Sequence, residues 1–337
     1  MNKFIYAYSA MKKKEDKTTL EIKKIKERYE EEAPMENINA IEIKGLTKSF
    51  KGMYALNGLN MTVPVGSIYG FIGENGSGKS TTEKLICGLL VPNSGTIKLF
   101  GKDYTDPGIR VKVGALIENA GCFPGSSVYT NLKMQALNLN LENPDEQIDR
   151  VLKIVRMEES KSIKFKSCSL GMKQRIGIAM ALLGDPTLLI LDEPINGLDT
   201  DGMRIMREIL VDITQNYGCT VLISSHILGE LEKIATHYGI IRQGKMIQEL
   251  SAKDMDSRCR LFTSIKTKNI QLTDELLRKQ YKNVKIEDDY IRVYDVDDTE
   301  SIVDYLFKNG QIVSEIKKNK IGLEEYYIEL MSQKEAK

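Results

Sequence analysis

Between residues 39 and 254, the hydrophobic positions form short continuous runs that are separated by segments with helical spacing. Continuous apolar runs of this length are typical of strands buried in a parallel sheet. A helical pattern begins at Gly78, and helical spacing dominates residues 127–185. The strands predicted in this part of the chain are residues 40–43, 67–72, 187–191 and 220–224. Because strands and helices alternate, the pattern predicts an α/β layered fold.

A change of pattern after residue 254 predicts a second, smaller α/β domain at residues 255–337. Its predicted order is strand, helix, a hairpin of two strands, helix and strand, which is the order of ferredoxin-like domains. The predicted elements are residues 260–266, 273–281, 284–287, 290–296, 300–308 and 311–316, followed by a last helix at residues 323–331.

Residues 1–38 alternate blocks of both charges and carry only a thin apolar stripe. Thr18 and Glu21 have the spacing of a helix-capping box, and Pro34 would end that helix. The pattern predicts a charged N-terminal extension, which is either a loosely held arm or a docking helix.

The charge balance argues against nucleic acid as a partner, because 48 basic residues against 47 acidic ones leave no global basic field. The apolar share of 42% is that of a soluble globular protein. No apolar run approaches the roughly 18 residues that a membrane span needs. The five cysteines show neither paired nor metal-binding spacing, so we expect reduced thiols in a cytoplasmic protein.

A glycine-rich loop follows the second predicted strand and has the pattern G-x-x-x-x-G-K-[ST]. Glycines let the backbone N–H groups curl around a polyphosphate, and the helix that starts near Lys79 adds its positive dipole end. Lys79 would contact the β- and γ-phosphates, and the Ser80 hydroxyl would ligate Mg²⁺. The predicted nucleotide-binding residues are Gly73, Glu74, Asn75, Gly76, Ser77, Gly78, Lys79, Ser80 and Thr81. The loop therefore predicts a site for a nucleoside triphosphate with magnesium.

The apolar strand at residues 187–191 is followed by two acids, Asp192 and Glu193. The carboxyl end of a buried strand lies where α/β sheets hold their ligands. Asp192 could ligate Mg²⁺ there, and Glu193 could polarise an attacking water. Alone, the pair could be solvated acids at a strand end, but the phosphate loop favours the catalytic interpretation.

Between these motifs lies the stretch SCSLGMKQRIGIAMALLGDP, in which residues 169–175 resemble the signature motif of the ABC ATPases. The form is S-L-G-M-K-Q-R rather than the commoner S-G-G-Q. The resemblance covers about residues 41–249, with the motifs in the family order. It implies a P-loop NTPase core of the ABC ATPase type, with a helical subdomain, at residues 39–254.

The resemblance also implies a role for each matching residue. Phe50 matches the aromatic residue that stacks on adenine, and His226 matches the switch histidine that contacts the γ-phosphate. The signature residues Ser169, Leu170 and Gly171 would close on the γ-phosphate of the opposite subunit, and Asp199 ends the D-loop at residues 197–199.

Other interpretations of three of these residues stay open. Phe50 could pack in a turn or in the core. Ser169 has a good residue type for capping the helix that follows it, a role compatible with phosphate binding. A histidine at a strand end, like His226, is often structural, and we interpret His237 as structural.

The family resemblance implies a mechanism in which two nucleotide-binding subunits pack head to tail. Each ATP would lie between one subunit's phosphate loop and the other's signature, so ATP joins the subunits and hydrolysis releases them. One loop and one signature per chain imply a second copy, most simply a homodimer. A separate transmembrane permease would carry the substrate path, with this chain peripheral on the cytoplasmic face of the membrane.

Glu118 departs from the family pattern, because most members have a glutamine at this place that contacts Mg²⁺. A carboxylate ligates magnesium more strongly than an amide, but it adds negative charge near the γ-phosphate. We therefore treat Glu118 as a candidate catalytic and metal-binding residue.

The stretch LIEN together with SLGMKQR resembles the bacitracin and lantibiotic immunity branch, although a single drifted position in another export ATPase would look the same. Residues 122–124 and 129–132 would face the permease.

These observations predict the ATPase subunit of an exporter that removes a peptide antibiotic or another hydrophobic substrate. The alternative is a soluble ABC protein acting on ribosomes or DNA. Such proteins usually carry two cassettes or a long coiled-coil insertion, for which the 90 residues between Lys79 and Ser169 leave no room. A third hypothesis is a non-catalytic regulatory module whose C-terminal domain binds a ligand, but the Asp192, Glu193 and His226 set argues against it.

Overall fold

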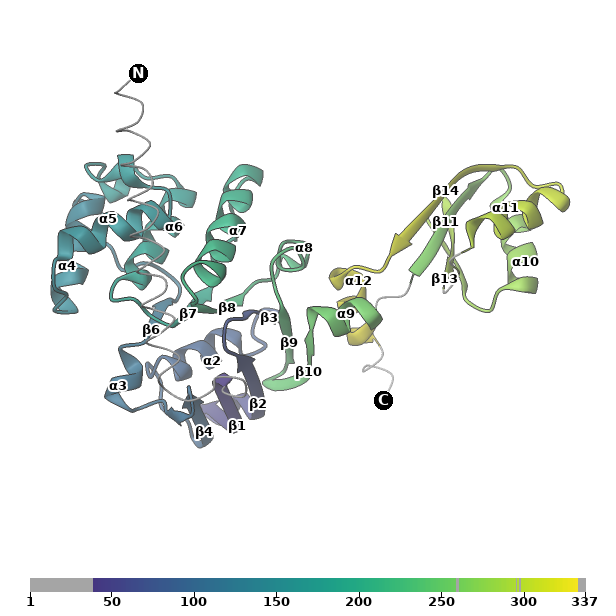
Figure 1. Ribbon diagram of the computed structural model, residues 1–337. Coiled ribbons are helices and arrows are strands. Elements are labelled where there is room, and N and C mark those ends of the chain that lie inside the picture. The colour runs from purple at the N-terminus through teal and green to yellow at the C-terminus, as the bar shows by residue number, and fades with distance from the viewer. Residues whose placement is uncertain (1–38, 259–260, 295, 297, 333–337) are drawn as a thin grey trace, which may run out of the picture. The chain divides into compact units, whose positions relative to one another are not determined.

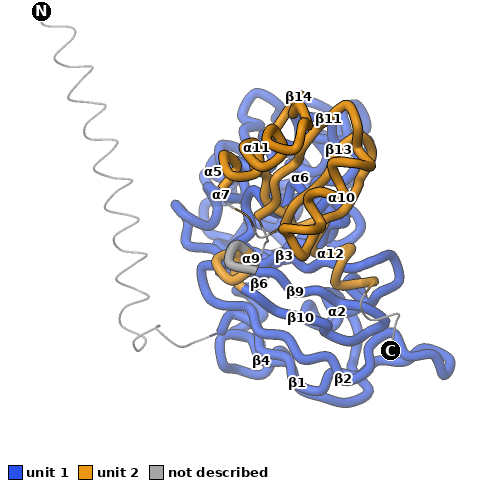
Figure 2. The backbone as a smooth tube through the Cα atoms, turned by 90° about the vertical axis from the view of Figure 1, so that its right-hand side faces the viewer, with its two compact units in different colours: residues 1–250 blue, residues 251–337 orange. Residues whose placement is uncertain are grey.

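The computed structural model describes residues 39–258, 261–294, 296 and 298–332. The chain divides into two compact units, of which unit 1 ends at Leu250 and unit 2 begins at Ser251 (Figure 2). The predicted N-terminal extension, residues 1–38, lies outside the described residues, as do residues 259–260, 295, 297 and 333–337 of the predicted C-terminal domain.

Unit 1 contains a mainly parallel sheet and an antiparallel sheet (Figure 1). The main sheet has the order β10-β9-β3-β8-β7-β6, and β9, β3, β8, β7 and β6 run parallel. Its strands are β3 (Ile68–Ile72), β6 (Val113–Leu116), β7 (Leu188–Asp192), β8 (Thr220–Ser224), β9 (His237–Arg242) and β10 (Lys245–Ser251). The predicted α/β layered fold is confirmed by this sheet and the helices around it.

The antiparallel sheet has the order β2-β1-β4-β5, with β1 (Asn39–Phe50), β2 (Met53–Pro64), β4 (Ser94–Leu99) and β5 (Lys102–Asp103). The sequence predicted only residues 40–43 of this sheet. The register between β1 and β2 shifts several times, and each irregularity interrupts the alternation of buried and exposed residues on which strand prediction relies.

The helices of unit 1 are α2 (Lys79–Ile86), α3 (Pro107–Arg110), α4 (Val128–Asn138), α5 (Pro144–Ile154), α6 (Leu170–Leu182), α7 (Thr200–Gln215) and α8 (Leu228–Leu231), with short 3₁₀ turns at Glu158–Ser160 and Phe165–Ser167. Helices α4, α5 and α6 pack on one another and form the predicted helical subdomain (Figure 1). No helix in the described ranges has the length and apolar character needed to cross a membrane.

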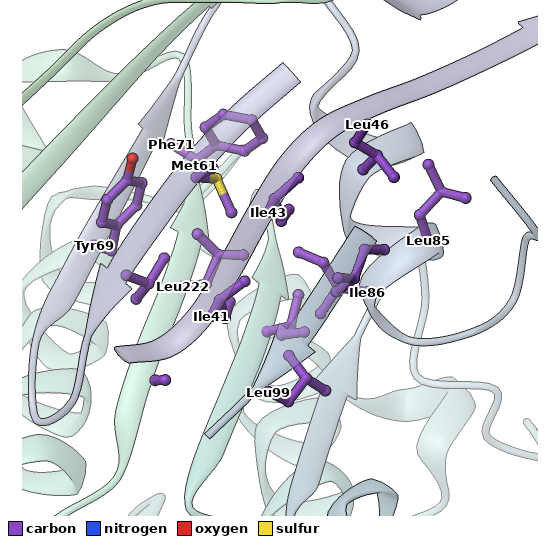
Figure 3. Packing of buried hydrophobic residues seen from close by; sticks show 14 of the residues in the cluster. Ile41, Ile43, Leu46, Met61, Tyr69, Phe71, Leu85, Ile86, Leu99 and Leu222 are labelled. Atoms are coloured by element: carbon purple, nitrogen blue, oxygen red, sulfur yellow. The ribbon is translucent and has the colours of Figure 1, made fainter. Parts of the chain in front are cut away.

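A buried hydrophobic core joins the two sheets of unit 1 to helix α2 (Figure 3). Its side chains come from the antiparallel strands β1, β2 and β4, from β3, β7, β8 and β9 of the main sheet, and from the helices α2 and α3. Burying one such side chain fully contributes about 1.5–3 kcal/mol, so this core fixes α2 and β3 against each other. The side chains labelled in Figure 3 are Ile41, Ile43, Leu46, Met61, Tyr69, Phe71, Leu85, Ile86, Leu99 and Leu222.

Unit 2 has a four-stranded antiparallel sheet with the order β12-β13-β11-β14. This strand order and the element order βαββαβ are those of ferredoxin-like domains, as the sequence predicts. The elements are α9 (Ala252–Arg258), β11 (Leu261–Thr267), α10 (Ile270–Gln280), β12 (Val284–Glu287), β13 (Tyr290–Tyr294), α11 (Thr299–Lys308), β14 (Val313–Lys320) and α12 (Leu323–Ser332).

The last strand of unit 2 continues beyond its predicted end at residue 316. It includes residues 317–320, whose sequence is KKNK. β14 is an edge strand, where lysines are frequent because they discourage pairing with another chain. A polar run of this kind carries no strand-like alternation, so the sequence did not reveal it.

Candidate active site

The carboxyl ends of four parallel strands meet at one edge of the main sheet. The register pairs Phe71 of β3 with Ser224 of β8, and Ser224 with Asp192 of β7. Leu191 is paired with Leu116, the last residue of β6. The chain segments that follow these strands therefore lie side by side at this edge, where α/β sheets bind ligands.

The glycine-rich loop connects β3 to α2 at this edge, and Lys79 is the first residue of the helix. Lys79 is only 5% exposed, and its Nζ donates to the carbonyls of Gly73, at 2.6 Å, and Glu74, at 3.2 Å. The ammonium group is thus held inside the loop by the backbone. A buried cation that faces the start of a helix suits a polyphosphate.

Two glycines of the loop leave no space for a side chain. A Cβ at Gly73 would lie 2.6 Å from the Ile241 carbonyl oxygen, and one at Gly78 would lie 2.8 Å from the Ala55 carbonyl oxygen. Gly78 also has a φ of 113°, which side-chain-bearing residues rarely adopt. The loop is therefore pressed against β2 and β9, which fixes its curvature.

The proposed magnesium ligands Ser80 and Asp192 lie close together, with 3.5 Å between the Ser80 Oγ and the Asp192 Oδ1. Ser224 donates to the same Asp192 oxygen at 2.8 Å. In the described ranges no three His, Cys, Asp or Glu side chains gather into a metal site. A hydroxyl and one carboxylate nevertheless fit Mg²⁺, which usually takes one or two carboxylates and completes its shell with substrate phosphates and water.

Glu193 lies next to Asp192 and contacts His226. Its Oε2 is 2.9 Å from His226 Nδ1 and accepts a hydrogen bond from Asn196 Nδ2 at 3.1 Å. The Glu193 backbone has a φ of 47° and donates to Ser224 Oγ at 3.1 Å. Strained backbone of this kind is frequent at functional sites. A carboxylate held between a histidine and an amide can orient and polarise a water.

Sequence reasoning missed Ser224, Asn196 and Glu83. Ser224 bridges Asp192 and Glu193, and Asn196 holds the Glu193 carboxylate. Glu83 on α2 is fully buried, and neither of its carboxyl oxygens has a hydrogen-bond partner among the described residues. Burial and the neighbouring charge of Asp192 raise the pKa of Glu83 to about 8. An acid on the apolar face of a helix is the one signal that could have singled out Glu83.

The signature and D-loop residues lie close to one another. Ser169 is the N-cap of α6 and accepts from the Met172 N–H at 3.2 Å, and Asp199 caps α7 in the same way. A Cβ at Gly197 would lie 3.0 Å from a Leu170 methyl, which places the two loops side by side. Within the described residues, no hydrogen bond joins Ser169 or Asp199 to the phosphate loop.

Phe50 ends β1, and the residue is 44% exposed. The Lys48 Nζ lies 5.2 Å from the centroid of this ring. Lys48 is paired with Leu56 on β2, and Leu56 is one of the residues against which Gly78 packs. The aromatic ring is thus presented to solvent on the strand hairpin that borders the phosphate loop.

Glu118 lies two residues beyond the end of β6, with a φ of 63°. Its Oε1 is 2.6 Å from the Nζ of Lys84 on α2. The sheet therefore brings Glu118 to the same edge as Asp192, although its carboxylate is paired with a lysine there.

Comparison with known proteins places this geometry in a family. Residues 56–196 match the family described as ABC transporter. The bacitracin transport ATP-binding protein BcrA of Enterococcus faecalis is 34% identical over 296 residues, which cover 86% of this chain and 96% of that protein. The lantibiotic transport ATP-binding protein SrtF of Streptococcus pyogenes is 38% identical over 224 residues, which cover 66% of this chain and 96% of that protein.

Two solved structures illustrate the resemblance in fold. The structure of cbiO1 from Clostridium perfringens, part of the ABC transporter complex cbiONQ, superimposes with a TM-score of 0.60 and 26% identity, covering 72% of this chain and 96% of that one. The dimeric ATP-binding cassette MJ0796, bound to ADP and Pi, has a TM-score of 0.58 at 22% identity, with 63% and 98% covered, and supports the fold alone.

Proposed function

Because the chain belongs to the ABC transporter ATP-binding subunits, which bind and hydrolyse ATP, we propose that it energises the export of a membrane-active peptide antibiotic through a separate permease. Bacitracin and lantibiotics are the substrates that the relatives' names suggest. The protein would act at the cytoplasmic face of the membrane, bound to that permease.

In the proposed mechanism, the phosphate loop binds ATP and Phe50 stacks on the adenine. Lys79 would exchange its contacts with the loop carbonyls for contacts with the β- and γ-phosphates. Ser80 and Asp192 would hold Mg²⁺, with Glu118 as a further ligand. When bound, the metal neutralises charge on the phosphates.

The contact between Glu193 and His226 is the observation that supports the proposed mechanism of ATP hydrolysis. Glu193 would accept a proton from the attacking water while Asn196 and His226 hold its carboxylate in place. His226 would also contact the γ-phosphate. Ser224 keeps Asp192 and Glu193 in register, because it is bonded to both.

The signature residues would complete the ATP site of a second copy of the chain. The side chains of Ser169 and Asp199 each accept a hydrogen bond from one N–H group in the first turn of their own helix. The other N–H groups at the start of α6 are therefore available to a phosphate. We therefore propose a homodimer in which Ser169, Leu170 and Gly171 close on the partner's γ-phosphate.

The exposed loop between β6 and α4 would dock on the permease. Phe123 in this loop is 61% exposed, while Asn131 holds its backbone by accepting from the Phe123 N–H at 2.7 Å. An apolar side chain displayed on a fixed backbone suits contact with a partner.

We also propose that residues 39–254 form the nucleotide-binding domain, residues 255–337 an accessory domain and residues 1–38 a charged extension. The boundary of the two units at Leu250 supports this division. The similarity to BcrA covers 296 residues, more than unit 1 contains, so it extends into unit 2. This extent supports an accessory domain that follows the nucleotide-binding domain.

Expression of the protein with its permease in an antibiotic-sensitive bacterium tests the export function. We expect the minimal inhibitory concentration of bacitracin or a lantibiotic to rise several-fold, and expect no rise with the Glu193→Gln variant. If the active pair leaves sensitivity to both classes unchanged while ATP is hydrolysed, the substrate assignment is wrong.

A further inference from the structure

The ion pair between Lys84 and Glu118 joins two elements of the ATP site that lie 34 residues apart in the chain. Lys84 is in the last turn of α2, the helix that begins at Lys79 of the phosphate loop. Glu118 follows β6, which is paired with the strand that carries Asp192. The pair therefore connects the phosphate loop helix to the segment beside the metal-binding carboxylate.

The exposure of this pair and the backbone conformation of Glu118 argue against a purely structural role. Side-chain exposure is 31% for Lys84 and 62% for Glu118, and exposed ion pairs contribute little to stability. Glu118 also adopts a φ of 63°, which costs free energy in a residue with a side chain. A strained residue in a weak surface pair points to a use other than folding.

Charge explains what the lysine could do at this place. Glu118 adds a negative charge to an edge that already holds Asp192 and Glu193, and the γ-phosphate of ATP would add more. The Lys84 Nζ, 2.6 Å from the Glu118 Oε1, offsets the charge of this carboxylate. A glutamine at the same position would not need such a partner.

We propose that Lys84 is a positioning residue for Glu118, which holds the carboxylate and offsets its charge so that MgATP can bind beside it. This inference rests on the proposed role of Glu118 in the ATP site. Lys84 itself contacts neither the nucleotide nor the metal.

A double-mutant cycle tests the proposal with the full-length protein and a fluorescent ATP analogue. Lys84→Gln should weaken binding of the analogue about threefold to tenfold and raise the Mg²⁺ concentration needed for half-maximal binding. The corresponding ADP analogue should be affected less, because it has no γ-phosphate. In the Glu118→Gln background, the Lys84→Gln change should have no effect.

Two further variants separate positioning from a general loss of charge. Lys84→Arg keeps the positive charge and should bind nearly as well as the wild type. Arg150→Gln removes an ion pair of similar exposure in the helical subdomain, between Arg150 and Asp185 at 2.5 Å, and should leave nucleotide binding unchanged. The thermal unfolding midpoint should hardly change in any variant, since the pairs are exposed.

The outcomes distinguish this inference from the role of Glu118. Equal effects of Lys84→Gln in the wild-type and Glu118→Gln backgrounds, or no effect in either, would overturn the positioning role of Lys84. If Glu118→Gln alone changes neither affinity nor Mg²⁺ dependence, while Lys84→Gln still weakens binding only when Glu118 is present, then the proposed role of Glu118 is wrong and the coupling stands.

Discussion

At the edge of the main sheet, hydrogen bonds between neighbouring strands hold Asp192, Glu193 and Ser224, whereas the signature loop holds Ser169 only through the helix that it caps. The first region is built by the pairing of β7 with β8, which the hydrophobic core makes rigid. The second is the start of α6, and among the described residues no hydrogen bond joins Ser169 to the phosphate loop. In the proposed homodimer, the first region would hold ATP within its own chain, and the second would act on the ATP of a second copy.

The largest expected effect comes from Glu193 in the first region. Glu193→Gln should lower the turnover of ATP by about 100-fold or more, because general-base catalysis is worth that much. ATP affinity should remain, since the amide keeps the shape of the side chain. Steady-state phosphate release and equilibrium nucleotide binding measure the two quantities.

Glu232→Gln is the matched control, because this carboxylate is exposed just after α8. It should turn over ATP like the wild type. Rapid phosphate release by Glu193→Gln would show that another group activates the water.

The second region can be changed at Gly171 without disturbing the fold. Among the described residues, a Cβ at Gly171 would meet only a methyl of Leu198, at 3.6 Å, which is an ordinary contact. Gly171→Asp places a negative charge where the partner's γ-phosphate would bind. Turnover should fall by more than about tenfold in phosphate-release assays, and Gly171→Ala, which adds only a methyl group, should lose less.

Mixing the two impaired variants tests whether each ATP site is built from two chains. A heterodimer of Glu193→Gln and Gly171→Asp chains contains one ATP site with both changes and one site with neither. Mixing should therefore restore part of the ATPase activity, whereas a chain that carries both changes should stay inactive. No recovery from dimers shown to have exchanged subunits would mean that each site is built within one chain.

The sequence predicted where the first region lies, because that position depends on short motifs. The glycine loop and Asp192-Glu193 each follow a buried strand, so their position at the sheet edge follows from the parallel order of the strands. Ser224 could not be singled out, because serine is common at strand ends. Its link to Asp192 depends on which strands become neighbours, and that is decided by packing over the whole chain.

Long-range contacts also explain what the sequence left out elsewhere in the fold. Nothing in the local pattern pairs Lys84 with Glu118, since they come together only when α2 packs beside the sheet. Most of the antiparallel sheet was missed because irregular pairing hides its alternation. In contrast, the order of the elements from β11 to α12 in unit 2 could be predicted, because most of these strands and helices have a regular local pattern.

A smaller effect is expected at Phe50, which would contribute to the first region by stacking. Phe50→Ala should raise the dissociation constant for ATP about fivefold, since an aromatic contact is worth roughly 1 kcal/mol. Phe50→Tyr should preserve the affinity. Binding of inorganic tripolyphosphate, measured by competition, should not change, because it has no base to stack. Equal losses for ATP and tripolyphosphate would place the effect in the phosphate loop instead.

The smallest effect concerns Glu83, whose burial beside Asp192 raises its pKa to about 8 from an ordinary value of 4.5. The folded protein then holds a proton that the unfolded chain has already lost, so the free energy of unfolding should fall as pH rises from about 4.5 to about 8. Glu83→Gln removes this titration. As pH rises from about 4.5 to about 8, the free energy of unfolding of the variant, measured with urea, should therefore increase relative to that of the wild type. Above this interval the difference should level off. A difference that stays constant with pH would show that Glu83 carries the same charge in the folded and unfolded states. The geometry of the first region would then distinguish it from the second, but a shifted pKa would not.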